Sequence, residues 1–141
     1  MIHRKRYRPG GVLSALLLLA ACGEEAPMGP EGGVAGIWSI QAFEDATNCG
    51  EGTDSYSLSV RIEQSGNSLT VTIDGTDYTG SLTGTTGTWS GSYDEDGGTT
   101  TEEYTVTFAN ANSTLSGGSE WTWSDGASSC SGTVTVTGSR Q

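Results

Sequence analysis

Positive charge is almost absent from most of this 141-residue chain. Four of the six Lys and Arg residues, and the single His, lie within the first eight positions. From residue 22 onward, Arg61 and Arg140 stand against all 17 acidic residues, with no Lys and no His. Such an acidic chain repels phosphate backbones, so we expect no nucleic-acid partner. It also lacks the imidazole and amine groups on which most nucleophilic enzymes and His-ligated metals depend, so we expect neither enzymatic activity nor a cofactor.

Long hydrophobic stretches are missing as well, apart from one near the N-terminus. A basic stretch from Arg4 to Arg8 precedes an apolar run from Val12 to Ala21. This run is about half the ~20 residues that a membrane-spanning helix needs. The layout is typical of a cleaved secretory signal peptide and not of a transmembrane anchor.

The end of this run carries a recognisable motif. Leu19-Ala20-Ala21-Cys22 resembles the lipobox of bacterial lipoproteins. The resemblance implies a lipoprotein signal peptide over residues 1–21, cleavage before Cys22, and acylation of Cys22 by chains such as palmitate. Several acyl chains on one residue would hold the protein durably on a bilayer. Gly23, where Asp is the inner-membrane signal, further implies the outer membrane, on its periplasmic or surface face, if the host has one.

The segment that follows has the composition of a tether. Residues 22–35 combine the predicted lipidated Cys22 with Pro, Gly and Glu and show no hydrophobic periodicity. Such a segment is expected to be a flexible linker. The remaining residues, 36–141, suffice for one small hydrophobic core, so we expect a single domain there.

Apolar residues in this domain alternate with Ser and Thr. The alternation predicts strands with one buried and one wet face. Turn signals rich in Gly, Asn and Asp separate about eight such runs, and no helix is expected after Ala21. The apolar positions are Trp38, Ile40, Ala42, Tyr56, Leu58, Val60, Ile62, Leu69, Val71, Ile73, Tyr78, Leu82, Trp89, Tyr93, Tyr104, Val106, Phe108, Leu115, Trp121, Trp123, Val134 and Val136.

Short connections between consecutive strands favour an all-β, antiparallel up-and-down barrel of about eight strands, with a β-sandwich as the alternative.

The two remaining cysteines support closure of the barrel. Cys49 follows the first predicted strand and Cys130 opens the last. In a closed barrel with an even number of strands, those two points lie side by side on one rim. In an oxidising export compartment, we therefore expect a Cys49–Cys130 disulfide at the closing seam.

A family resemblance enters at the two ends of this domain. Gly36-Ile37-Trp38 resembles the Gly-x-Trp motif of lipocalins and their calycin relatives, and Arg140 resembles the arginine that packs over this Trp in lipocalins. The resemblance covers residues 36–140 and implies a lipocalin-like barrel plugged at one end by Gly36, Trp38 and Arg140. A guanidinium stacked on an indole would contribute about 0.5 to 2 kcal/mol.

Whether such a barrel is hollow stays open from the sequence. An eight-stranded interior is either filled by side chains or holds one small ligand. Gly80, Gly91, Gly117 and Ser119 fall on inward positions, where each either bends a strand or leaves room. If the barrel is a cup, its lining is expected to be aromatic. The expected lining residues are Tyr56, Tyr78, Trp89, Tyr93, Tyr104, Trp121 and Trp123.

Acidic residues around a predicted hairpin are the remaining candidates for chemistry. Asp94, Asp96 and Glu102 provide oxygen ligands of the kind that Ca²⁺ prefers, but their spacing matches no full calcium-binding loop. A solvated, charged turn is the other interpretation.

Three hypotheses of function follow. In the first, a membrane-anchored, monomeric lipoprotein binds a small apolar ligand in a lipocalin-like barrel. In the second, a packed barrel has a structural or interaction role in the cell envelope. In the third, the domain is a Ca²⁺-binding module or a carboxylate hydrolase.

Overall fold

The computed structural model describes residues 33–49 and 53–141. The predicted signal peptide, Cys22 and most of the predicted linker therefore lie outside the described residues. The described part contains no helix long and apolar enough to cross a membrane. Its strands are β1 (Gly36–Thr47), β2 (Ser55–Ser65), β3 (Ser68–Ile73), β4 (Thr76–Thr83), β5 (Thr86–Glu95), β6 (Gly98–Ala109), β7 (Thr114–Ser124) and β8 (Ser129–Arg140).

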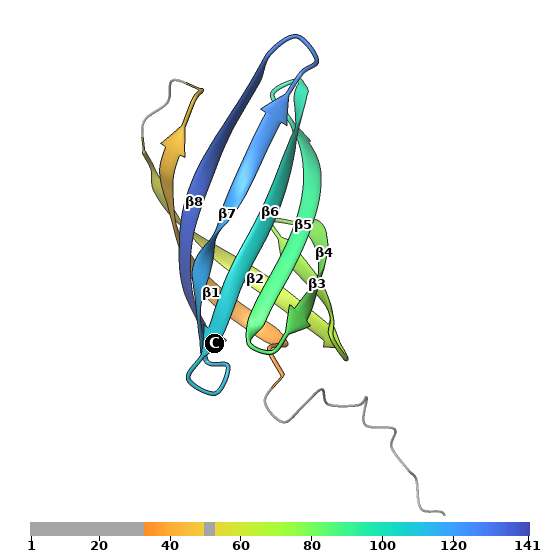
Figure 1. The fold of residues 1–141 in the computed structure, drawn as a ribbon, viewed down its shortest axis with the longest axis vertical. Coiled ribbons are helices and arrows are strands. Elements are labelled where there is room, and N and C mark those ends of the chain that lie inside the picture. Colours follow the sequence, from red (N-terminus) through yellow and green to blue (C-terminus); the bar gives the residue numbers. More distant parts are fainter. Residues whose placement is uncertain (1–32, 50–52) are drawn as a thin grey trace, which may run out of the picture.

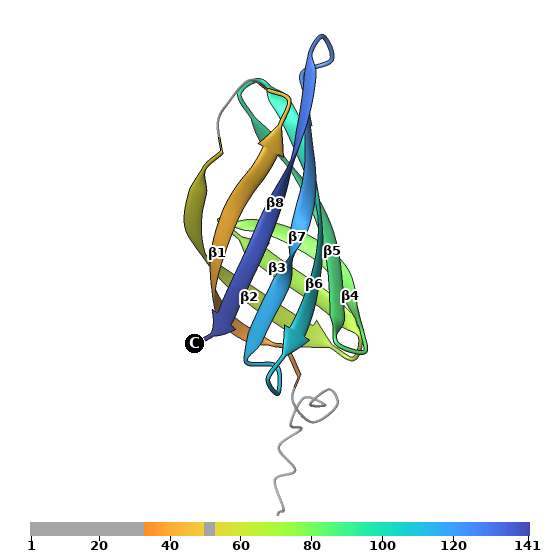
Figure 2. The ribbon, with the colours of Figure 1, turned by 60° about the vertical axis from the view of Figure 1, so that its left-hand side comes forward.

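The strands form a closed barrel in chain order. Each strand pairs antiparallel with the next, and β8 returns to pair with β1 (Figures 1 and 2). The predicted up-and-down barrel of eight strands is confirmed, and the sandwich is excluded.

Local sequence explains why the strands turn where they do. In the β3–β4 hairpin, Asp74 and Gly75 have φ values of 47° and 83°, and in the β5–β6 hairpin Asp96 and Gly97 have 49° and 78°. Two successive positive φ values define the turn whose twist matches antiparallel strands, and Asp-Gly favours it. Between turns, period-two alternation sets the inner face, as β6 shows with every second side chain buried from Thr100 to Phe108.

One end of the barrel is closed by a plug. Trp38 is fully buried, and Arg140, its cross-strand partner, places its guanidinium carbon 5.3 Å from the centre of the indole ring. Phe108 meets the same indole edge-on, with ring centres 5.3 Å apart. Gly36 has a φ of +145°, a conformation that favours glycine. The contact expected between Trp38 and Arg140 is thus present.

The packed region begins before the first strand. Val34 is buried, its N–H donates to Gln64 Oε1 over 2.8 Å, and its carbonyl accepts from Trp38 Nε1 over 3.0 Å. The side chain of Arg140 also donates to the carbonyl of Gly33. Gly33 and Val34, which fall within the linker predicted over residues 22–35, therefore dock on the closed end of the barrel.

The opposite rim carries the disulfide. Cys49, just after β1, is bonded to Cys130, at the start of β8, with their Cα atoms 5.3 Å apart. The bridge joins the first and last strands at the barrel seam, as the sequence predicts. We call this rim the open end, because the main cavity of the barrel lies there.

Candidate functional site

The barrel interior divides into a packed half and a hollow half. Toward the plug, aliphatic side chains leave a void of only about 20 Å³, too small for a ligand. At the open end the interior widens into a cavity of about 670 Å³, which we call the cup. The cup is lined by Glu44, Asn48, Cys49, Tyr56, Tyr93, Glu95, Asp96, Thr100, Glu102, Trp121, Trp123, Ser128, Ser129 and Cys130.

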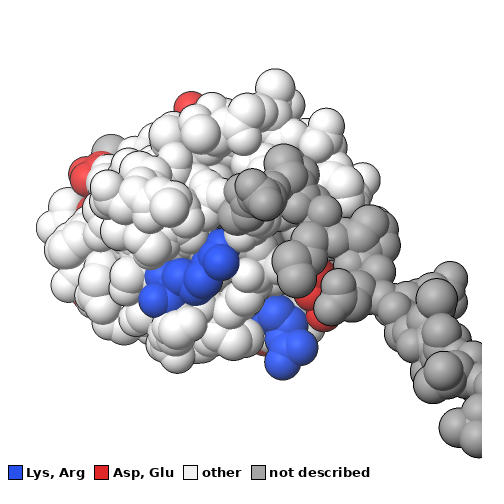
Figure 3. Space-filling view, turned by 90° about the horizontal axis from the view of Figure 1, so that it is seen from below, with Lys and Arg blue, Asp and Glu red and all other residues white. Residues whose placement is uncertain are grey.

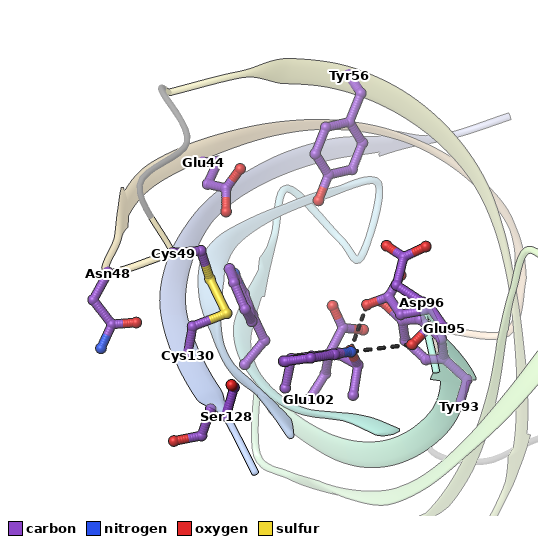
Figure 4. Close-up of a pocket in the computed structure, with 14 residues that line it drawn as sticks. Glu44, Asn48, Cys49, Tyr56, Tyr93, Glu95, Asp96, Glu102, Ser128 and Cys130 are labelled. Carbon is purple, nitrogen blue, oxygen red and sulfur yellow. Dashed lines mark hydrogen bonds between the residues drawn. A yellow bond between two sulfur atoms is a disulfide. The ribbon is translucent and has the colours of Figure 1, made fainter. Parts of the chain in front are cut away.

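Side chains from several strands converge on the cup. In Figure 4, Tyr56 of β2 and Glu44 of β1 point inward from one side, while Tyr93, Glu95 and Asp96 lie across from them. Trp123 of β7 reaches across β6 to the end of β5, where its Nε1 donates to the carbonyl of Glu95 over 3.1 Å. The alternation that buries apolar residues in the lower half thus presents polar and aromatic ones here.

The wall of the cup is incomplete on one side, because two strand ladders end before they reach the open end. The β2–β3 ladder ends at Val60 and Ile73, and the β4–β5 ladder ends at Thr79 and Ser90. The first five residues of β2 and the last five of β5 therefore have no paired strand between them, and Figures 1 and 2 show β3 and β4 confined to the lower barrel. A second cavity of about 310 Å³ lies there. It shares Tyr56, Tyr93, Glu95 and Glu102 with the cup, so the site has an end mouth and a side opening.

Glu102 of β6 lies where the two cavities meet. Its side chain is only 8% exposed. Its Oε2 accepts a hydrogen bond from the Tyr78 hydroxyl over 2.6 Å and a longer one from the Tyr104 hydroxyl over 3.3 Å. No donor among the described residues bonds to Oε1. Trp89 stacks on Tyr104 with ring centres 5.6 Å apart and so underpins this group.

The protonation of this cluster follows from its burial. Burial raises the pKa of the Glu102 carboxyl above its ordinary value, while the hydrogen bonds from Tyr78 and Tyr104 act in the opposite direction. Burial, together with the nearby Glu102 carboxylate, raises the pKa of both tyrosines as well. Both phenols therefore stay protonated and can donate to the carboxylate at neutral pH.

A glycine fixes the position of Tyr78. A Cβ atom at Gly91 would lie 2.6 Å from the Tyr78 ring, so the ring occupies the space that a side chain there would fill. At Gly80 and Gly117 a Cβ would come within 1.9 and 2.1 Å of backbone oxygens of the neighbouring strands. These inward glycines allow close approach of strands or rings and leave no empty space.

Six of the seven aromatic residues expected to line a cup do so. Tyr56, Tyr93, Trp121 and Trp123 line the main cavity, and Tyr78 and Tyr104 line the adjoining one. The expectation is wrong for Trp89. This residue lies in the packed half, where it borders the small void beneath Tyr104.

The three acidic residues considered for Ca²⁺ are not brought together. Asp94 is exposed on the outer face, where its carboxylate accepts from Thr99, whereas Glu102 faces the interior and Asp96 lies at the rim. Among residues 33–49 and 53–141, no group of three or more His, Cys, Asp or Glu side chains is placed to hold a metal ion.

The sequence-based expectations include Glu102 only as a Ca²⁺ ligand and do not include Glu44. Glu44 and Glu102 share the strand parity of buried neighbours, Ala42 and Tyr104, and both line the cup. The alternation alone places them inside. Strand parity is a weak signal for a carboxylate, because a charged residue is ordinarily expected to face solvent.

Charge is distributed unevenly along the barrel axis. The two arginines of the described residues lie at the closed end, which Figure 3 views directly. Arg140 covers Trp38, and the exposed Arg61 lies 3.9 Å from Glu63. The cup lining contains Glu44, Glu95, Asp96 and Glu102 and no basic side chain. The cup is therefore acidic as well as aromatic, whereas the sequence predicts an aromatic lining for a small apolar ligand.

Comparison of the chain with protein-family models and with curated proteins finds no match. The closed eight-stranded antiparallel barrel is consistent with a lipocalin-like fold.

Proposed function

We propose that this protein is an exported lipoprotein, anchored to the cell envelope through acylated Cys22, that binds a small organic molecule in its cup. The cavity of about 670 Å³, walled by aromatic rings, carries this proposal. Ligand sites in proteins commonly occupy about 300–1,000 Å³ and combine apolar walls with a few polar groups. The lack of His and Lys after residue 22 supports binding without catalysis.

The placement of the cup at the end of the barrel opposite the N-terminal segment suits an anchored binding protein. The described chain enters at Gly33, which is docked at the closed end, and the cup opens at the other end. A lipid anchor at Cys22, a short distance before Gly33, would hold the closed end toward the membrane. The mouth would then face the aqueous compartment, which in a diderm host is the periplasm or the cell exterior.

Anchoring is tested by metabolic labelling with palmitate in the native host. We expect label on the wild-type chain and none on Cys22→Ala, with the Cys49→Ser, Cys130→Ser double variant as a labelled control. Label on Cys22→Ala, or none on the wild type, would refute anchoring at this residue.

Cargo is tested by native mass spectrometry of the chain purified from its own host in mild detergent. We expect a discrete mass, beyond the acyl chains, that leaves on denaturation. Cargo-free protein that also binds nothing from a broad panel of amines, alcohols, acids and lipids would refute the binding function and favour a structural role.

Intrinsic fluorescence locates the bound molecule. Trp121 and Trp123 line the cup, whereas Trp38 and Trp89 lie in the packed half. A cup ligand should change the emission of wild type but leave the Trp121→Phe, Trp123→Phe double variant nearly unresponsive. The Trp38→Phe variant, changed at the closed end, is the matched control and should respond as the wild type does.

A further inference from the structure

A buried carboxylate without a cation is the most unusual feature of the cup. Glu102 is more than nine-tenths buried, yet its partners are two neutral phenols that both approach Oε2. Burying an ionised carboxylate is costly unless a positive charge pairs with it. Both arginines of the described residues lie at the other end of the barrel. The described residues therefore leave the positive partner of Glu102 to be supplied from outside.

The other charged residues that line the cup are also acidic. Glu44, Glu95 and Asp96 line the cavity above Glu102, and no Lys or Arg joins them. A cleft lined by one sign of charge, with walls of low polarity, concentrates ions of the opposite sign. Cations are thus favoured at the mouth, and carboxylate or phosphate ligands are repelled.

The aromatic rings of the cup are also complementary to a cationic ligand. Tyr56, with 39% of its surface exposed, and the half-buried Tyr93, Trp121 and Trp123 surround the space over the carboxylates. Ring faces attract cations directly and also stack on flat apolar groups. A ligand with one positive centre and an aromatic or short alkyl body satisfies both the carboxylate and the walls.

The geometry does not favour a bare metal ion in this place. A divalent metal needs several oxygen ligands converging within about 2.0–2.6 Å. No such group of three acidic, His or Cys side chains occurs among the described residues. A cavity of about 670 Å³ is also far larger than an ion requires, whereas it accommodates a small organic molecule.

From these observations we propose that the cup selects a small organic cation, a protonated amine or quaternary ammonium on an aromatic or short alkyl body, with its charge against Glu102. This inference rests on the proposed binding function and specifies its ligand class. Tyr78 and Tyr104 orient the carboxylate through Oε2, which leaves Oε1 for the ligand. The side opening beside Tyr56 gives the body of the ligand a second exit from the cup.

The test compares matched probes on the full chain by isothermal titration calorimetry at pH 7. Phenethylamine is cationic, 2-phenylethanol is its neutral counterpart, and 3-phenylpropionate is an anion of similar size. A second series with naphthyl bodies tests the same three charges on a larger ligand. We expect the amine to bind at least tenfold more tightly than the alcohol and the anion not to bind.

Variants assign the selectivity to Glu102. Glu102→Gln keeps the shape of the side chain and an acceptor for the tyrosines, so we expect it to reduce the amine preference to within threefold while alcohol binding persists. Glu103→Gln, its exposed neighbour on the outer face, should leave both affinities unchanged. Circular dichroism checks that each variant is folded.

The outcomes separate the two proposals. Alcohol binding as tight as amine binding would overturn cation selectivity while supporting the cup as a binding site. Unchanged amine preference in Glu102→Gln would overturn the role of Glu102. If no probe of either series binds and the native mass spectra show no cargo, the binding function itself fails.

Discussion

The two halves of the barrel share most of their strands, all but β3 and β4, and yet differ in kind. Along the inner face of β6, Phe108 and Val106 lie in the packed half, Tyr104 lies at the boundary, and Glu102 and Thr100 line the hollow half. The strand pattern is identical throughout, with every second side chain inward. Alternation therefore decides which residues face inside, whereas the size and polarity of those residues decide whether the inside is filled.

The halves also differ in how they are held together. Dispersion and apolar burial stabilise the closed end, where Trp38 contacts Phe108 and Arg140. The open end relies on the Cys49–Cys130 bridge and on hydrogen bonds across the rim, such as the one from Trp123 to Glu95. Stability is thus concentrated away from the site, and this separation leaves the cup free to expose aromatic and acidic groups.

The largest expected effect contrasts two tryptophans. Trp38→Ala removes a fully buried indole and should lower the free energy of unfolding by about 3–5 kcal/mol. Trp121→Ala removes a half-buried ring that lines the cup and packs only partly against the core, and it should cost less, about 1–2 kcal/mol. Urea denaturation followed by circular dichroism measures both. Equal losses would show that the upper half is packed like the lower one.

Removal of the disulfide should come next in size. The bridge spans 81 positions of the chain. Loop-closure entropy sets its contribution at about 4 kcal/mol at most. We expect the Cys49→Ser, Cys130→Ser variant to lose a large part of this stability and to show faster amide exchange at the open rim. Faster exchange of similar size around Trp38 would contradict a division into two halves.

An added methyl group at Gly91 tests how the floor of the cup is positioned. Gly91→Ala drives a Cβ into the Tyr78 ring and should cost about 1–3 kcal/mol. It should also displace the Tyr78 hydroxyl from Glu102 and weaken amine binding. Ser90→Ala, on the exposed face of the same strand, is the control and should change neither quantity. Unaltered stability in Gly91→Ala would mean that Tyr78 is free to move.

The smallest expected effect on stability concerns Glu102 and pH. Burial raises the folded-state pKa of Glu102, so its favourable contribution is present below its unfolded pKa and is lost as pH rises through the folded pKa. Relative to wild type, Glu102→Gln should therefore gain thermal stability as pH increases from 4 to 7. Parallel melting curves of the two proteins across this range, with Glu103→Gln as reference, provide the measurement. A difference that does not vary with pH would contradict a raised pKa.

Much of the fold was accessible from the sequence. Apolar alternation, Asp-Gly turns and the positions of two cysteines predict the closed barrel and its seam, because strand parity and turn chemistry are local properties. The site was only partly predictable. Six aromatic lining residues follow from parity, but Trp89 was misplaced because parity says nothing about depth along the barrel. Glu102 is a Ca²⁺ candidate from the sequence, but its position inside the barrel is not predicted, because a charged side chain is ordinarily expected in solvent.

The all-β class, the inward face of each strand and the acidic character of the domain can be read from the chain alone, since each depends on neighbouring residues or on composition. The half-filled, half-hollow interior is instead a property of the assembled barrel. That outcome depends on which side chains from different strands meet at one level of the barrel. It is why Glu102 and Tyr104 of β6 and Tyr78 of β4 lie together at the floor of a cup.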